Sequence, residues 1–178
     1  MGRAGGFGLL QAVSVEVDHR HSGRLGKAVE HLVAATCILT SDLQLNVSTS
    51  FVDDEGVDLV FARRGRPKTL AVQVKSRRVT TPSIERHGRF RANVRDATFE
   101  ARDDLVLLFV PVDTAQGTFD SAWLVPSVDF GRATSVNGRG RRVFAASTRP
   151  ASRDQWSGYR CSRSELAARL LDAIDRLA

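Results

Sequence analysis

Two short stretches decide the fold of this chain: Gly56-Val57-Asp58-Leu59-Val60-Phe61 and, after a turn, Leu70-Ala71-Val72-Gln73-Val74-Lys75-Ser76. Side chains alternate along a strand, so the apolar residues Leu59 and Phe61 share one face of the first run and Asp58 lies on the other. In the second run, Gln73 and Lys75 lie together, opposite the apolar face. The segment 63–68 contains Gly65 and Pro67 and predicts a hairpin connection. A carboxylate, an amide and an ammonium group would therefore converge at one edge of a sheet.

An Asp on one strand, followed on the next by a polar residue, any residue and Lys, resembles the motif of the PD-(D/E)XK nuclease superfamily. That superfamily also has a helical Glu upstream of the Asp, and Glu30 in segment 25–33 is at the matching place. The usual pattern has an acid two residues before the Lys, whereas this chain has Gln73. The resemblance covers residues 25–76 by motif, and a looser likeness continues over residues 104–130.

The resemblance implies a divalent cation, Mg²⁺ or Mn²⁺, held by oxygen ligands. Asp58 would be the main ligand, Glu30 would bind directly or through water, and Gln73 with the carbonyl that follows it would complete the protein's share. Lys75 would orient or deprotonate the attacking water, or stabilise charge on the phosphate. Gln73 offers a neutral oxygen without negative charge. We therefore expect weaker metal affinity than with an acid, and loss of activity is an open alternative.

Each of these residues also has an interpretation that involves no metal. Asp58 comes two residues after Gly56 and could cap a turn. Gln73 and Lys75 could lie on the solvated face of an edge strand, where Lys guards against aggregation. Glu30 flanks the apolar stripe of its helix and could form an exposed salt bridge. The combination favours the metal site, as does the choice of Lys75 in a chain whose cations are mostly Arg.

The composition predicts one compact domain with a polyanionic partner. The chain has 178 residues, is 42% hydrophobic and carries a formal charge of +6. Positive charge is concentrated in segments 59–102 and 131–163. Such a distribution is typical of proteins that contact nucleic-acid phosphates. An Arg-rich genome would also raise the Arg content, but would not separate the charges along the chain. The candidate phosphate contacts are Arg63, Arg64, Arg77, Arg78, Arg139, Arg141 and Arg142.

Other features indicate where the protein acts. Cys37 and Cys161 are too few for a disulfide framework, and no spacing suggests a zinc site. The first ten residues do not have the apolar core of a signal peptide, and no stretch approaches a membrane span. We therefore expect a cytoplasmic protein without a membrane partner. His19 and His21 could bind a metal, although a flexible polar segment is the simpler interpretation. Residues 53–55 are acidic and could add a ligand beside Asp58 or form a solvated turn.

The expected fold is a mixed α/β domain, an α+β mixed sheet, with the restriction-endonuclease-like αβββαβ core that the resemblance implies. We predict a flexible segment over residues 1–21 and a single nuclease-like domain over 22–178. Within it, a helix over 22–39 precedes strands near 43–51, 57–61 and 70–76, and Phe90, Ala92 and Val94 alternate like a further strand. Residues 105–112 read as a buried central strand. Further strands at 123–125 and 142–146 and a closing helix that begins after the capping-box pattern Ser162–Glu165 complete the fold.

The sequence thus predicts a metal-dependent endonuclease-like protein that hydrolyses DNA, with Glu30, Asp58, Gln73 and Lys75 as its site. One alternative is a non-catalytic nucleic-acid-binding or assembly module that retains the nuclease fold. Another is a small basic protein that binds some other anionic ligand. Because one such site cuts one strand, a homodimer is considered as the acting form.

Overall fold

The computed structural model describes the backbone of residues 7–49 and 56–177 and the side chains from residue 23 onward within these ranges. A long helix, α1 (Phe7–Thr40), is followed by the strands β1 (Leu45–Thr49), β2 (Leu59–Arg63) and β3 (Thr69–Arg78). The middle of the chain contains α2 (Pro82–Glu85), β4 (Arg89–Arg95), the 3₁₀ turn η1 (Asp96–Thr98) and β5 (Leu105–Val112). The last third contains β6 (Ser121–Pro126), α3 (Ser127–Ala133), β7 (Arg141–Ser147), η2 (Ser157–Tyr159), β8 (Arg160–Ser162) and α4 (Leu166–Arg176).

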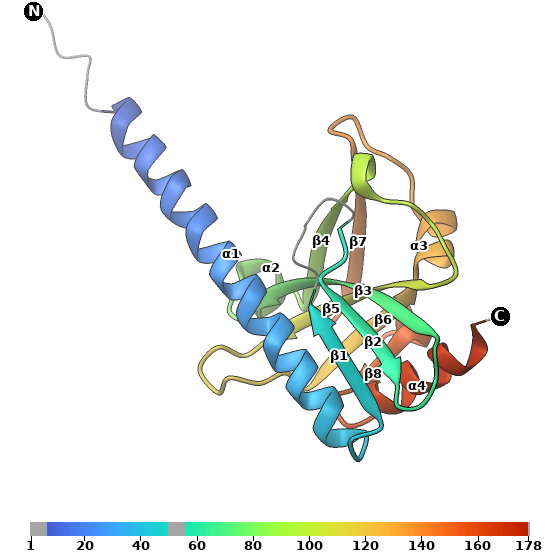
Figure 1. Ribbon diagram of the computed structural model, residues 1–178. Helices are drawn as coiled ribbons and strands as arrows, with labels where there is room; N and C mark the ends of the chain where they lie inside the picture. The colour runs from blue at the N-terminus through green and yellow to red at the C-terminus, as the bar shows by residue number, and fades with distance from the viewer. Residues whose placement is uncertain (1–6, 50–55, 178) are drawn as a thin grey trace, which may run out of the picture.

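Six strands form one mixed sheet in the order β1-β2-β3-β5-β6-β8 (Figure 1). Strands β1, β2 and β3 pair antiparallel, as do β5, β6 and β8, and the β3–β5 pair at the centre is parallel. A parallel pair needs a crossover connection, and here α2, β4 and η1 provide it. The mixed α/β fold expected from the sequence is confirmed, although the helical part of the crossover is a single turn.

Helices α1 and α4 cover one face of this sheet (Figure 1). Val29, Val33 and Cys37 of α1 and Leu170 and Ile174 of α4 are buried against strand residues of β1, β2, β3, β5 and β6. The closing helix begins with the predicted capping box. The Ser162 amide donates to Glu165 Oε2 (2.7 Å), and the Glu165 amide donates to Ser162 Oγ (3.3 Å).

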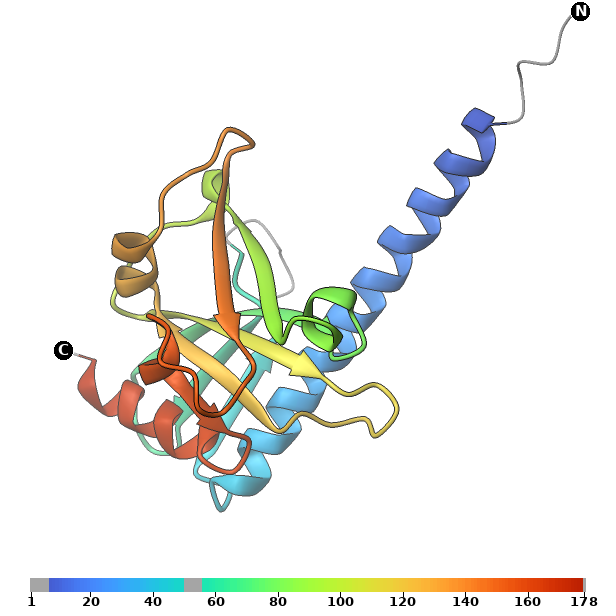
Figure 2. The same ribbon diagram turned by 180° about the vertical axis from the view of Figure 1, so that it is seen from behind.

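The opposite face of the sheet is covered by a separate two-stranded ribbon, β4 with β7, and by α3 (Figure 2). Aromatic rings fill the space between the layers. Phe109 of β5 and Phe144 of β7 stack with their ring centroids 3.7 Å apart and an angle of 6° between the ring planes. Phe90, Trp123 and Trp156 are also buried in this cluster. The ribbon is therefore attached to the main sheet by apolar packing on its inner face.

Element boundaries differ from the sequence prediction at several places. Helix α1 begins at Phe7, so the boundary predicted between residues 21 and 22 lies inside this helix, and its backbone continues through Gly23 and Gly26. Helices α2 and α3 and the short β8 were not predicted. Within the described ranges, no helix is long and apolar enough to cross a membrane.

Candidate functional site

Asp58 lies where β2 separates from β3. Its amide donates to the Val72 carbonyl (3.0 Å), which continues the ladder that pairs Leu59 with Val72. Beyond Val72, the edge of β3 that faced β2 has no strand partner among the described residues, while β5 pairs with the opposite edge. The first amide on the open edge is that of Val74, and it donates to Asp58 Oδ2 at 2.6 Å. The carboxylate thus occupies the fork between the two strands.

The electrostatics of Asp58 show which groups surround it. Burial is the largest influence and raises its pKa above 3.8, because removal from water disfavours the charged form. The Val74 hydrogen bond and then the Lys75 ammonium act in the opposite direction and lower the pKa. The Glu30 carboxylate raises it, and the Lys27 ammonium lowers it. Glu30 and Lys75 therefore both lie within electrostatic reach of Asp58.

Glu30 reaches this region from α1 and is only 6% exposed. Its Oε2 atom accepts a hydrogen bond from Lys27 Nζ at 2.9 Å, one helical turn earlier. The alternative of a salt bridge is thus realised, but the carboxylate is buried, whereas that alternative placed it in solvent. A buried carboxylate with a lysine partner remains chemically suited to hold a cation, since only one of its oxygens is engaged in this ion pair.

Gln73 is 7% exposed, so it does not belong to a solvated strand face. Its amide packs against Gly56, whose φ is +66°. A Cβ atom at position 56 would lie 2.4 Å from Gln73 Nε2, closer than real Cβ contacts allow. Gly56 therefore provides the space for the Gln73 side chain and also adopts a backbone conformation that favours glycine. The sequence analysis assigned no role to Gly56, and its position two residues before Asp58 was the available signal.

Lys75 is half-buried on the same face of β3 as Gln73, and its register neighbour on β5 is Phe109. It lies on the part of β3 that has lost β2 as a partner, so its ammonium group stands beside the fork that Asp58 occupies. Burial of Gln73 and partial burial of Lys75 place this polar pair within the fold. The edge-strand interpretation therefore fits Lys75 in part and does not fit Gln73.

The residues that could hold a metal are Asp58, Glu30 and the side-chain oxygen of Gln73. Among the described residues, no group of three or more His, Cys, Asp or Glu side chains forms a candidate metal site. Two carboxylates and one amide still form a donor set suited to a hard cation, because Mg²⁺ keeps several waters and needs few protein ligands. The acidic segment 53–55 lies outside the described residues, as do the side chains of His19 and His21.

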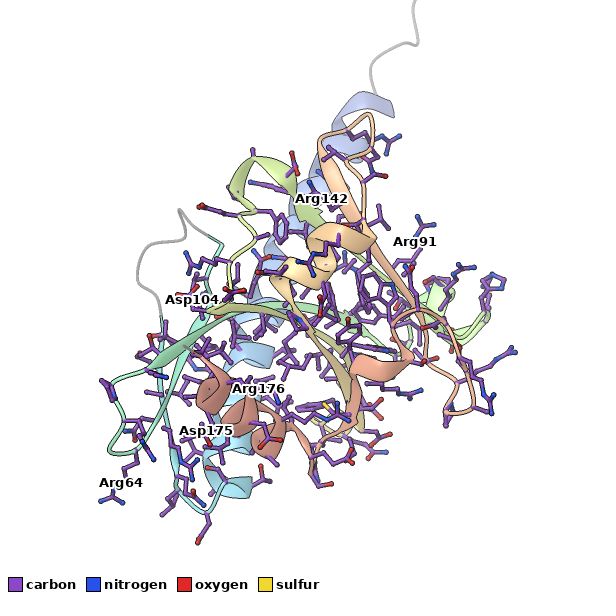
Figure 3. The ribbon with its side chains drawn as sticks, turned by 90° about the vertical axis from the view of Figure 1, so that its right-hand side faces the viewer. Arg64, Arg91, Asp104, Arg142, Asp175 and Arg176 are labelled. Carbon is purple, nitrogen blue, oxygen red and sulfur yellow. The ribbon has the colours of Figure 1, made fainter. Side chains whose placement is uncertain are left out.

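The seven arginines predicted to contact phosphates do not form one surface. Arg63 pairs with Asp175 and donates to Gln44 Oε1 (3.2 Å). Arg64 is exposed beyond β2, at the end of the molecule far from Arg142 (Figure 3). Arg77 and Arg78 are exposed at the far end of β3, and Arg139 and Arg141 are exposed near the start of β7.

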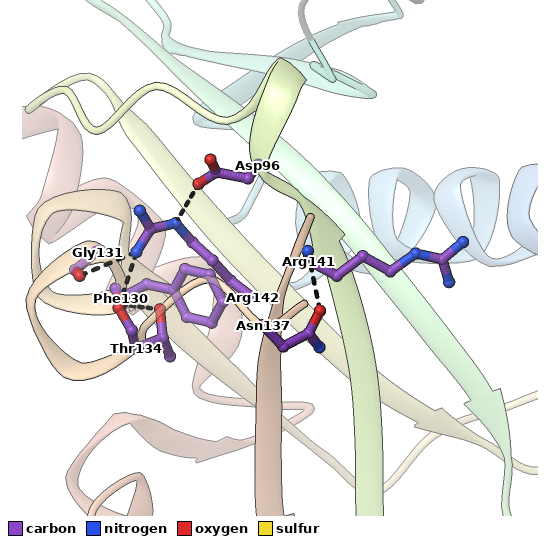
Figure 4. A network of polar contacts seen from close by, with 7 residues as sticks. All are labelled: Asp96, Phe130, Gly131, Thr134, Asn137, Arg141 and Arg142. Carbon is purple, nitrogen blue, oxygen red and sulfur yellow. Dashed lines mark hydrogen bonds and ion pairs between the residues drawn. The ribbon is translucent and has the colours of Figure 1, made fainter. Parts of the chain in front are cut away.

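Arg142 has a structural role that the sequence analysis did not foresee. Its Nε donates to Asp96 Oδ1 (2.8 Å), and its NH1 donates to the carbonyls of Thr134 (2.8 Å) and Gly131 (3.3 Å), as Figure 4 shows. Its guanidinium group also lies 5.3 Å from the centre of the Phe99 ring. Arg142 therefore connects β7 to α3 and η1, and we leave it out of the proposed phosphate contacts.

Both cysteines are buried and free. Burial raises the pKa of the Cys37 thiol to about 12 and that of the Cys161 thiol to about 11. At neutral pH both thiols are therefore protonated, and neither is suited to act as a nucleophile or a metal ligand.

Comparison with known proteins adds no family assignment. No protein-family model matches the chain, and no curated protein matches it.

Proposed function

We propose that this protein is a metal-dependent nuclease that hydrolyses DNA phosphodiester bonds in the cytoplasm. The observation that carries the proposal is the partly buried Asp58 carboxylate at the fork of β2 and β3, hydrogen-bonded to the Val74 amide and within electrostatic reach of both Glu30 and Lys75. Two neighbouring carboxylates, of which Glu30 is buried and Asp58 partly buried, are unfavourable for packing alone. A divalent cation would offset the repulsion between the two acids.

Asp58 and Glu30 would hold Mg²⁺ or Mn²⁺ together with the oxygen of Gln73. When bound, the cation would lower the pKa of a water ligand and polarise the phosphate. Lys75 would orient the attacking water or stabilise negative charge on the phosphate, since its ammonium lies beside the same fork. The Val74 amide fixes the orientation of the Asp58 carboxylate, because it donates to Oδ2 at 2.6 Å. The other Asp58 oxygen does not take part in this hydrogen bond and would hold the cation.

A second candidate is a non-catalytic module that binds nucleic acid. Two features of the same site favour it. Gln73 brings no negative charge to the donor set. Glu30 already has Lys27 as a partner at 2.9 Å. If these two features outweigh the attraction of the site for a cation, the fold binds DNA without cutting it.

The test is a cleavage assay with linear, circular and branched DNA in Mg²⁺, in Mn²⁺ and in chelator. The variants are Lys75→Ala and, as a matched control that removes a lysine from an exposed position outside the site, Lys68→Ala. Positioned acid–base groups contribute roughly 10²–10⁴-fold to such reactions. We expect Lys75→Ala to lose activity by that order and Lys68→Ala to keep it.

Calorimetric titration with Mn²⁺ tests the metal site separately from cleavage. We expect binding by the wild type, loss of binding in Asp58→Asn, and tighter binding in Gln73→Glu, which restores the acid of the superfamily motif. Absence of Mn²⁺ binding and of cutting, with DNA binding retained, would replace the nuclease by the non-catalytic module.

A further inference from the structure

Strand β4 has arginines at alternate positions along its outer face. Its inward residues Phe90, Ala92 and Val94 are buried in the aromatic cluster. The alternate residues of β4 point outward and are all exposed. They are Arg89, Arg91, Asn93 and Arg95. On the neighbouring strand, Arg141 pairs with Arg95 in register and is exposed too. We name Arg89, Arg91, Arg95 and Arg141 the ribbon arginines.

Within the described ranges, the side chains of these four arginines make no hydrogen bond that holds the fold together. Among the described residues, no carboxylate forms an ion pair with any ribbon arginine. Arg142 provides the contrast, because it points to the inner side of the ribbon and is held by Asp96 and two carbonyls. Figure 4 shows Arg141 and Arg142 extending to opposite sides of β7, and Figure 3 shows Arg91 extending away from the protein. The outward arginines are thus available to a partner.

A pocket at one end of the ribbon continues the positive surface. It has a volume of about 240 Å³ and is lined in part by His87, Arg89, Arg149, Ser152 and Asp154. The carboxylate of Asp154 is already engaged, because Oδ2 accepts from the Ser147 amide (2.7 Å) and from Ser152 Oγ (3.2 Å), and Oδ1 accepts from the Trp156 amide (2.9 Å). Besides Asp154 and the serines, the polar side chains of the lining belong to Arg89, Arg149 and His87. Such a lining favours an anion.

The spacing of the arginines suits a regular chain of phosphates. Alternate residues on a strand lie about 6.8 Å apart, so Arg89 to Arg95 spans roughly 20 Å. A B-DNA strand presents a phosphate about every 3.4 Å of helix axis, so this length covers about six base-pair steps. The inner face of the ribbon is packed on the aromatic cluster, so the ribbon offers one exposed face along which a backbone can lie. Strand β4 also packs beside β3, the strand that carries Lys75.

We propose that the outer face of the β4–β7 ribbon binds the sugar-phosphate backbone of duplex DNA. The ribbon arginines contact phosphates along this length of the duplex, and the pocket lined by His87, Arg89 and Arg149 takes a phosphate at the end of the row. The choice of DNA rests on the proposed function, but these residues are distinct from Glu30, Asp58, Gln73 and Lys75. The contacts carry no sequence information, because they reach the backbone and not the base edges.

The test is the salt dependence of binding to a labelled 20-base-pair DNA duplex, followed by fluorescence anisotropy in chelator. The variant is Arg91→Ala with Arg95→Ala. The matched control, Arg132→Ala with Arg176→Ala, removes the same charge from exposed positions on α3 and α4. Each phosphate contact contributes about 0.9 to the slope of log affinity against log salt, so we expect the ribbon variant to lower that slope by about 1.8. We expect the control to leave the slope unchanged.

A second variant, Arg149→Glu, tests the pocket end of the surface, and circular dichroism verifies that every variant is folded. We expect Arg149→Glu to weaken binding at low salt. Equal losses in the ribbon variant and the control would show that only net charge matters and would overturn the proposal. If the ribbon arginines only protect a strand edge from aggregation, the ribbon variant will have the same slope as the wild type. That result would also overturn the proposal. Tighter binding to duplex RNA of the same sequence would overturn the assignment to DNA.

The outcome is independent of the nuclease proposal. Wild-type protein that binds DNA through the ribbon but cuts nothing would refute cleavage and retain the ribbon surface. If cutting depends on Lys75 but the ribbon variant binds DNA like the wild type, the nuclease proposal stands and the ribbon surface is refuted.

Discussion

The replacement Gly56→Ala tests the geometry of the candidate site most directly. Real Cβ atoms essentially never approach closer than 3.0 Å, and the new Cβ would lie 2.4 Å from Gln73 Nε2, so the amide must move by at least about 0.6 Å. A left-handed φ costs a non-glycine residue about 1–2 kcal/mol, and alanine recovers about 0.4–1 kcal/mol by restricting the unfolded chain. Moving the Gln73 side chain away from its preferred rotamer adds about 0.5–1.5 kcal/mol. We expect Gly56→Ala to lower the free energy of unfolding by about 0.5–3 kcal/mol.

Gly65→Ala is the matched control, because Gly65 has a φ of +76° and a Cβ atom there would meet nothing within 4 Å. It carries the same backbone strain without the clash, so its loss should stay below about 1.5 kcal/mol. Urea unfolding measures both, and 1 kcal/mol corresponds to about 2–4 °C in Tm for a chain of this size. In a double-mutant cycle, Gln73→Ala should relieve part of the cost of Gly56→Ala. Equal losses for the two glycines, with no coupling to Gln73, would refute this description of the site.

Two further predictions concern charge. Burial raises the pKa of Asp58 above 3.8, so the stability that its protonated form contributes is fully present below pH 3.8 and is lost as pH rises through the higher value in the folded state. Asp58→Asn should therefore be more stable than the wild type at pH 7, and this difference in stability should vanish toward pH 3. Urea unfolding measures it, and a variant that is less stable at pH 7 would contradict the burial argument. Arg142→Ala should lower the free energy of unfolding by about 2–4 kcal/mol because it leaves Asp96 and two carbonyls without their donor. Arg141→Ala should change stability by less than about 0.5 kcal/mol, and the reverse order in thermal unfolding would refute the different roles of these neighbours.

Strand periodicity allowed most of the sheet to be predicted from the sequence. The apolar run of β5 and the alternation in β4 are determined by which side chains must be buried, and burial is the dominant favourable term in folding. The approach of Asp58, Gln73 and Lys75 also followed from alternation along two strands joined by a short turn. Their relation to Glu30 required the helix to lie over the matching end of the sheet, which the motif resemblance implied and periodicity did not.

The errors also have physical causes. Ser22 is a favoured residue for a helix N-cap, so this local signal placed the helix start there, whereas α1 begins at Phe7 and continues through Ser22. The contact between Gly56 and Gln73 joins residues that lie far apart in the chain, so local patterns do not reveal it. Arg142 could have been recognised, because it shares the inward parity of Phe144 and Ala146 on β7.

The stacked rings of Phe109 and Phe144 fix the distance between the β4–β7 ribbon and the candidate site. Phe109 is the register neighbour of Lys75, and Phe144 belongs to the strand that completes the ribbon. The position of the ribbon relative to the candidate site is therefore determined by rigid apolar contact and not by a loop. If both surfaces hold the same duplex, the number of nucleotides between the gripped phosphates and the cut bond is set by this ring pair. A smaller side chain at position 144 would then shift the point of cleavage along the DNA.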